Sequence, residues 1–149
     1  MPASNNISEL AIELGRSMAE MRNYLRQFIQ AKIKEHTVDI TFEMLEIMAC
    51  LWKKDGIKQQ EIADITIKDK SSMTYLIDNL VKRNLITRQP DENDRRSNLI
   101  FLTPQGKLLE DQLHPWLLEM YGNATVGVAI KDVQQSISLI KKMNLNLKL

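Results

Sequence analysis

The chain has 149 residues and a formal net charge of +1; charged residues make up 26% of it and aromatic residues 5%. This length suffices for one domain with a hydrophobic core, and the composition is typical of a helix-rich globular protein, which excludes a disordered chain. The single cysteine, Cys50, excludes an internal disulfide, and the longest central apolar run, 47–52, is far shorter than the roughly 20 residues that span a bilayer. The small net charge neither supports nor excludes nucleic-acid binding, because a basic surface can be local. The polar start shows no signal peptide, so we expect a cytoplasmic protein.

Two amphipathic helices are predicted in the first third of the chain. From Ile7 to about Lys34 apolar residues recur every three or four positions. The second helix is predicted to begin near Thr41, which can cap it, and to end at the basic and glycine-containing run 53–56. The apolar stripes of this first helix and of a last helix predicted over Lys131–Leu149 exceed what a small domain can cover, which indicates burial against a partner.

A short strand and two further helices are predicted next. Residues 57–58 can form the strand and 59–65 a brief helix, and Asp69 is well placed to cap a helix from about Lys70 to Arg83. In that helix one face is apolar and is predicted to pack inward: Met73, Leu76, Ile77, Leu80 and Val81. Its other face is small and polar. Asn84 follows where a left-handed backbone is favoured.

Two β-prone runs between Ile86 and Leu102 flank a charged turn, which we place at 91–96 and which carries Arg95 and Arg96. A helix followed directly by such a hairpin is typical of a winged helix. We therefore predict a mainly α fold with a small β-hairpin wing: a winged helix-turn-helix flanked by N- and C-terminal helices.

Helices are also predicted after the hairpin. Thr103 and Pro104 are suited to the N-cap and the first helical position, and Pro115 should kink the helix that they begin. After a loose segment at 122–127, a last helix from about Lys131 carries apolar residues at helical spacing.

Three segments resemble the MarR family of bacterial transcription regulators. They are the run 59–63 (Gln-Gln-Glu-Ile-Ala), the helix end 76–86, and the wing signature 91–96 with its Leu-Thr-x-x-Gly exit at 102–106. The resemblance covers roughly 41–106. Lys58 departs from the Ser or Thr that usually caps the first of these helices, and the turn at Thr66 and Ile67 lacks the usual small residue.

This resemblance implies a homodimer that binds double-stranded DNA at a pseudo-palindromic operator, most often as a repressor relieved by a small-molecule effector. On this view 1–149 is a single regulator domain, in which about 7–36 and 107–149 are dimerisation helices and about 41–106 is the DNA-binding part. The effector and its binding residues stay unknown.

Groove geometry assigns DNA contacts to three sets of residues. A helix fits the major groove, so the outward positions in its first half are candidates for base or phosphate contacts. Lysines and the glutamines of the preceding helix would contact phosphates, and Arg95 or Arg96 would enter the minor groove. The predicted DNA-binding residues are Gln59, Gln60, Lys68, Lys70, Ser71, Ser72, Thr74, Tyr75, Lys82, Arg95 and Arg96. The family resemblance further implies that Asp94 pairs with an arginine and positions the wing.

Other interpretations stay open from the residues alone. A polar helix face is usually a solvated surface, and a winged helix can serve as a protein-interaction module without sequence-specific DNA binding. An enzyme is not supported, because neither a phosphate-binding glycine loop nor a nucleophile motif occurs, and no catalytic residue or cofactor is predicted. Two isolated histidines, His36 and His114, do not predict a metal site.

The remaining reactive and flexible side chains are expected in the core. Cys50 lies on an apolar helix face without a second cysteine, which favours a packing role over a redox one. A set of soft apolar residues could line an effector pocket but is more often core. That set is Met18, Met21, Met44, Met48 and Trp52.

Overall fold

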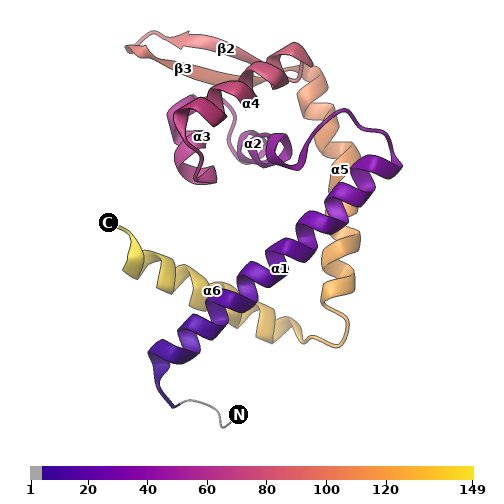
Figure 1. Ribbon diagram of the computed structural model, residues 1–149, viewed down its shortest axis with the longest axis vertical. Coiled ribbons are helices and arrows are strands. Elements are labelled where there is room, and N and C mark those ends of the chain that lie inside the picture. Colours follow the sequence, from indigo (N-terminus) through magenta and orange to yellow (C-terminus); the bar gives the residue numbers. More distant parts are fainter. Residues whose placement is uncertain (1–4) are drawn as a thin grey trace. The chain divides into compact units, whose positions relative to one another are not determined.

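The computed structural model describes residues 5–149, so part of the polar start, on which the expectation of no signal peptide rests, lies outside the described residues. The chain divides into two compact units, one ending at Trp116 and the other spanning Leu117–Leu149. Six helices and three strands are present in the described chain (Figure 1). Among these residues, no helix is both long enough and apolar enough to cross a membrane.

Helices α1 (Ile7–Glu35) and α2 (Phe42–Lys53) confirm the first two predicted helices. The Thr41 hydroxyl caps α2 by accepting a hydrogen bond from the N–H of Met44 at 3.2 Å. The C-terminal part of α1 packs against α2 and the middle of α5 in a small apolar cluster that contains Ile29, Phe42, Leu113 and Trp116. This cluster anchors α1 within the first unit by apolar burial.

Helices α3 (Gln59–Thr66) and α4 (Lys70–Lys82) form the helix-turn-helix. Met73, Leu76, Ile77 and Leu80 are buried as predicted, whereas Val81 remains 39% exposed at the edge of the packed face. The turn places Ile67 in the left-handed region at a φ of 52°, which is strained for a β-branched residue. Asn84 adopts the predicted left-handed conformation at a φ of 57°.

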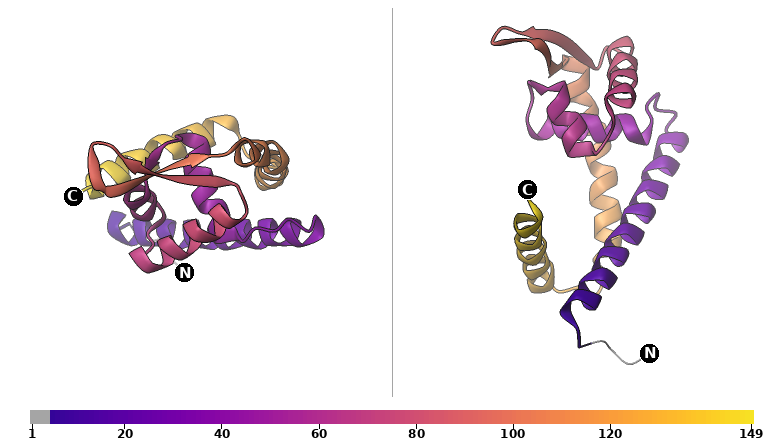
Figure 2. Two further views of the ribbon diagram at one scale, coloured as in Figure 1. Left: turned by 90° about the horizontal axis from the view of Figure 1, so that it is seen from above. Right: turned by 60° about the vertical axis from the view of Figure 1, so that its left-hand side comes forward.

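A three-stranded antiparallel sheet in the order β1-β3-β2 covers these helices. It consists of β1 (Ile57–Lys58), β2 (Ile86–Asp91) and β3 (Asp94–Leu102). Ile57 pairs with Ile100, and both side chains are buried in the main core together with residues of α2, α3 and α4. The β2–β3 hairpin projects beyond the helices on which it packs (Figures 1 and 2).

The hairpin turn is tighter than the sequence predicts. The strands pair as far as Asp91 and Asp94, so the turn contains only Glu92 and Asn93, and both wing arginines belong to β3. The physical reason is that the buried carboxylate of Asp91 accepts the N–H of Asn93 at 2.9 Å, which closes the turn early. The predicted six-residue turn is therefore wrong.

Helix α5 (Pro104–Ala124) begins as predicted, because the Thr103 hydroxyl accepts the N–H of Gly106 at 3.0 Å. A Cβ on Gly106 would lie 2.1 Å from the carbonyl oxygen of Leu85, so the close approach of helix and chain requires glycine. The helix continues past Pro115 to Ala124, so the loose segment predicted from Gly122 begins only after Ala124. Helix α6 (Ile130–Leu147) is the last element, and none of its residues is buried.

Candidate nucleic-acid interface

The outward face of α4 is a polar surface that is capped at its N-terminus. The Asp69 carboxylate accepts hydrogen bonds from the N–H of Ser72 at 2.7 Å and from the Ser72 hydroxyl at 3.1 Å. Both bonds lower the pKa of Asp69, the backbone bond more than the hydroxyl bond. The predicted DNA-facing residues of this helix are all exposed: Lys70, Ser71, Ser72, Thr74, Tyr75 and Lys82. The Tyr75 side chain is 67% exposed. Short polar side chains in the first two turns leave room for a groove edge to approach the backbone.

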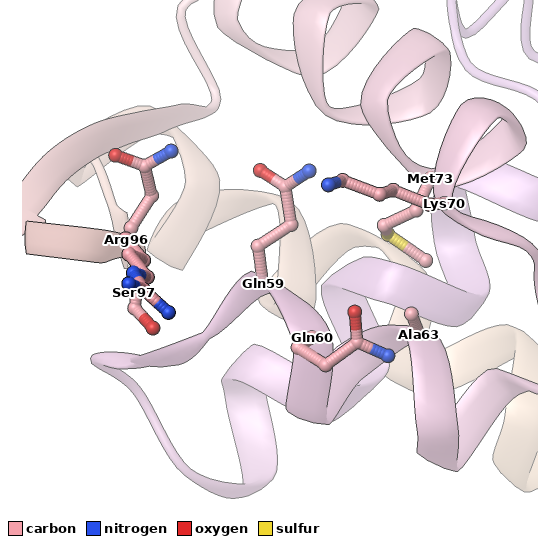
Figure 3. A pocket seen from close by; sticks show the side chains of 8 residues that line it. Gln59, Gln60, Ala63, Lys70, Met73, Arg96 and Ser97 are labelled. Carbon is pink, nitrogen blue, oxygen red and sulfur yellow. The ribbon is translucent and has the colours of Figure 1, made fainter. Parts of the chain in front are cut away.

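The wing and both helices of the helix-turn-helix meet around a polar hollow (Figure 3). Gln59 and Gln60 come from α3, Lys70 from α4, and Arg96 from β3. Arg95 precedes Arg96 in the strand, and its side chain takes the opposite face of the ribbon because side chains alternate along a strand. The structure thus brings four predicted site residues together and separates the two arginines.

Other predicted DNA-facing residues of α4 belong to other parts of the surface. Ser71, Ser72 and Tyr75 line a second hollow together with Lys68, whereas Lys82 lies beside Arg83 and Leu85 at the C-terminal end of the helix. The proposed contacts therefore extend along the whole length of α4.

The tip of the wing is held by two carboxylates. Asp94 accepts hydrogen bonds from the N–H of Arg96 at 3.1 Å and from the hydroxyl of Ser97 at 3.0 Å. Its structural partners are thus a backbone amide and a hydroxyl, where the family resemblance implies an arginine side chain. Asp91, which is 7% exposed, lies 3.9 Å from the Lys58 ammonium.

The order of the wing should depend on pH through Asp94. The Arg96 N–H and then the Ser97 hydroxyl hold the pKa of Asp94 below its usual value. A carboxylate with a lowered folded-state pKa contributes stability above its unfolded pKa of about 4 and loses it as the pH falls through the folded value. We expect the Arg96 amide resonance to titrate with a midpoint below 4, and this transition to disappear in Asp94→Asn. A midpoint above 4 would contradict the assignment.

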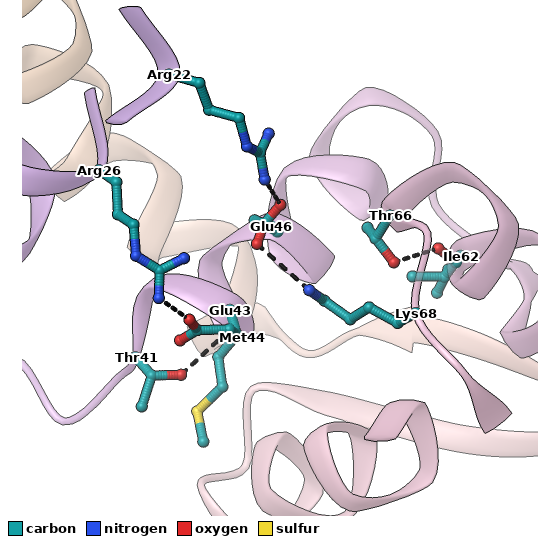
Figure 4. Close-up of polar contacts among 9 residues, drawn as sticks. All are labelled: Arg22, Arg26, Thr41, Glu43, Met44, Glu46, Ile62, Thr66 and Lys68. Carbon is teal, nitrogen blue, oxygen red and sulfur yellow. Dashed lines mark hydrogen bonds and ion pairs between the residues drawn. The ribbon is translucent and has the colours of Figure 1, made fainter. Parts of the chain in front are cut away.

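A chain of ion pairs connects α1 with the turn of the helix-turn-helix (Figure 4). Glu46 on α2 binds Arg22 of α1 at 2.6 Å and Lys68 at 3.4 Å, and its side chain is 15% exposed. One turn earlier Glu43 pairs with Arg26 of α1. A phosphate contact by Lys68 would therefore compete with Glu46 for the same ammonium group.

Replacing Glu46 should destabilise the fold more than replacing Glu43. Glu46→Gln leaves the Lys68 ammonium, which is 16% exposed, without its carboxylate, so we expect a loss of about 1–2 kcal/mol in unfolding free energy. Glu43 and Arg26 are 34% and 41% exposed, so Glu43→Gln should cost less than about 1 kcal/mol. Urea denaturation of both variants measures the difference, and the reverse order would contradict this account.

Arg88 of β2 lies in a network for which no sequence motif provides a signal. Its Nη2 donates to Asp78 of α4 at 2.7 Å, and its Nε donates to Gln59 of α3 at 3.3 Å. Gln59 in turn donates from Nε2 to the Thr74 hydroxyl at 3.3 Å. The pairing becomes visible only when strand and helix are packed, because ten residues separate Arg88 from Asp78.

The remaining candidates from the sequence do not assemble into a site. Met44 and Met48 are buried in the main core, whereas Met18 and Met21 are 41% and 55% exposed on α1. The Trp52 indole donates to the carbonyl of Gly106 at 2.9 Å.

Reactive and metal-binding side chains are likewise dispersed. Burial raises the pKa of the Cys50 thiol, and the negative charge of Glu46 raises it further, which opposes thiolate formation. The His36 ring stacks on Trp116 with centroids 5.1 Å apart. Within residues 5–149 no group of three or more His, Cys, Asp or Glu side chains is arranged to hold a metal ion.

A model of the MarR family matches residues 40–97. The chain is 27% identical over 139 residues to the uncharacterized HTH-type transcriptional regulator YkoM of Bacillus subtilis (strain 168). The aligned region covers 93% of this chain and 88% of that protein.

Solved structures of MarR regulators are also similar to this chain. The MarR transcriptional regulator from Methanosarcina mazei Go1 has a TM-score of 0.78 at 26% identity, over 91% of this chain and 98% of that one. A mutant MarR from E. coli complexed with operator DNA has a TM-score of 0.73 at 21% identity, over 93% and 99% of the two chains, and shares the fold.

Proposed function

We propose that this chain is a MarR-family transcription regulator that binds operator DNA as a homodimer through its winged helix-turn-helix, as the family match and the similar regulators support. Helix α4 enters the major groove, where Ser71, Ser72, Thr74 and Tyr75 approach base edges and phosphates. Lys70, Lys82, Gln59 and Gln60 contact phosphates, and Lys68 does so in exchange for Glu46. The wing reaches the adjacent minor groove through Arg96.

The observation that carries this proposal is the hollow shared by α3, α4 and the wing. Gln59, Gln60, Lys70 and Arg96 converge there from three elements, and no acidic side chain lines it among the described residues. Converging amides and cations suit a sugar-phosphate backbone that passes between the major-groove helix and the minor-groove wing.

Dimerisation is supported by apolar side chains that the single chain leaves uncovered. On α1, Ile7 is 82% and Ile12 55% exposed, and on α6, Ile130 is 77% and Ile137 50% exposed. A helix with an exposed apolar stripe is stable in water when a second surface covers that stripe. We therefore assign the dimer contacts to 7–36 and 107–149, and the DNA contacts to 41–106, within one regulator domain.

The regulator acts in the cytoplasm, where bacterial DNA is accessible, and represses until a small molecule lowers its operator affinity. Such a ligand acts by binding more tightly to a dimer whose two α4 helices are wrongly spaced for successive major grooves. The described structure assigns no residues to this effector.

Selection of binding sites from random duplex DNA tests the proposal. We expect an inverted repeat with half-sites about one helical turn apart, and an affinity for it that falls steeply with salt because several phosphates are neutralised. Lack of enrichment at low salt would overturn DNA binding and favour a protein partner for the same surface.

A further inference from the structure

Four side chains from three elements form a continuous network on the face of α4 that is proposed to meet DNA. Asp78 and Thr74 lie one turn apart on α4, Gln59 lies on α3, and Arg88 lies on β2. The links are Arg88 to Asp78 at 2.7 Å, Arg88 to Gln59 at 3.3 Å, and Gln59 to Thr74 at 3.3 Å. The Arg88 side chain is 30% exposed, and that of Asp78 is 48% exposed.

The chemistry of these groups fixes the direction of each hydrogen bond. A guanidinium group only donates, so the amide oxygen of Gln59 faces Arg88. The amide nitrogen of Gln59 therefore faces Thr74, and because it too only donates, the Thr74 oxygen is the acceptor. The hydroxyl proton of Thr74 is then free to be donated outward.

An unpaired Asp78 would attract hydrogen-bond donors on the DNA, whereas the Thr74 hydroxyl proton attracts acceptors. A free carboxylate accepts hydrogen bonds from base amino groups and repels phosphates. The ion pair with Arg88 occupies one of its oxygens and balances its charge. Arg88 thus removes an acceptor from this face of α4 while it maintains a donor one turn earlier.

We propose that Arg88 is a positioning residue that sets the base preference of Thr74, an inference that rests on the proposed DNA-binding function. Through Gln59, which occupies one acceptor position of the Thr74 oxygen, it directs the hydroxyl proton towards a base-edge acceptor, such as N7 or O6 of guanine or O4 of thymine. Arg88 itself makes no base contact in this arrangement.

The experiment measures Kd for the selected operator and for every single-base-pair variant of its half-site, at several salt concentrations. Thr74→Val removes the hydroxyl with little change in shape, and we expect about a fivefold loss of discrimination at one base pair. Arg88→Ala should lose discrimination at that same base pair by a similar factor. The double variant should lose no more than either single variant, because both changes remove one interaction.

Two further variants make the result specific. Arg88→Lys keeps the positive charge but cannot hold Asp78 and Gln59 in the same geometry, so it should lose the same discrimination even if Arg88→Ala proves unstable. Gln89→Ala changes the next, exposed residue of the strand and should leave both affinity and base preference at wild-type values.

The outcomes separate this inference from the proposed function. Loss of affinity that is uniform across base variants, with a salt slope reduced by about one per half-site, would make Arg88 a phosphate contact and overturn the positioning role. Additive losses in the double variant would overturn it as well. A wild-type protein that selects no duplex site would instead refute operator binding itself.

Discussion

Ile137→Glu should convert the dimer into a monomer and weaken operator binding by at least about 100-fold. Ile137 lies with Val133 and Ile140 on one stripe of α6, at positions i, i+4 and i+7. In a dimer this stripe is buried, and a carboxylate there would be desolvated without a partner. The monomer can engage only one half-site and so loses the gain from simultaneous binding of both halves. Analytical ultracentrifugation and a duplex titration measure the two effects.

Gln135→Glu is the matched control for this substitution. It adds the same charge to the same helix, about 200° around the helix axis from Ile137, on the polar side. We expect this variant to remain dimeric and to bind the operator normally. An Ile137→Glu protein that sediments as a dimer and binds with wild-type affinity would remove α6 from the dimer interface.

Arg96→Ala should weaken operator binding by about 100-fold in the dimer and leave its folding unchanged. Arg96 is exposed and lines the hollow with Lys70, so it is placed to reach DNA on the side where α4 binds. Each half of the complex would lose one charge-assisted contact worth about 1.5 kcal/mol. Operators that differ only in their flanks provide the specific readout, because a narrow A/T-rich minor groove attracts arginine.

Arg95→Ala is the control on the opposite face of the same strand, and we expect it to cost only about threefold. Wild-type affinity should fall when the A/T flanks are replaced by G/C, whereas the affinity of Arg96→Ala should not change further. Equal affinity losses in the two variants, or a flank effect that survives in Arg96→Ala, would contradict the assignment of Arg96 to the minor groove.

Local features of the fold were predictable because their causes are local. Thr41, Asp69 and Thr103 cap helices through hydrogen bonds that span three residues, and such caps are evident in a sequence. The helical spacing of Met73, Leu76, Ile77 and Leu80 likewise predicted the buried face of α4. The order of helix and hairpin then indicated the winged helix.

The errors arose where the burial of individual side chains, which the sequence pattern does not show, decides the structure. The wing turn is short because the carboxylate of Asp91 is buried and bound locally, although its charged sequence suggested an exposed loop. Val81 has helical spacing for burial, but the packed face of α4 ends before it reaches the residue.

For the candidate site, the sequence by itself determined which residue types are available: a polar face on α4, glutamines at the start of α3, and two arginines on a wing. Only the tertiary structure decided their relations. It placed Arg96 and not Arg95 beside α3 and α4, tied Lys68 to Glu46, and joined Arg88 to Asp78 and Gln59. The reason is physical: helical and strand periodicity specify the face on which a side chain lies, whereas ion pairs and hydrogen bonds between elements depend on how those faces pack.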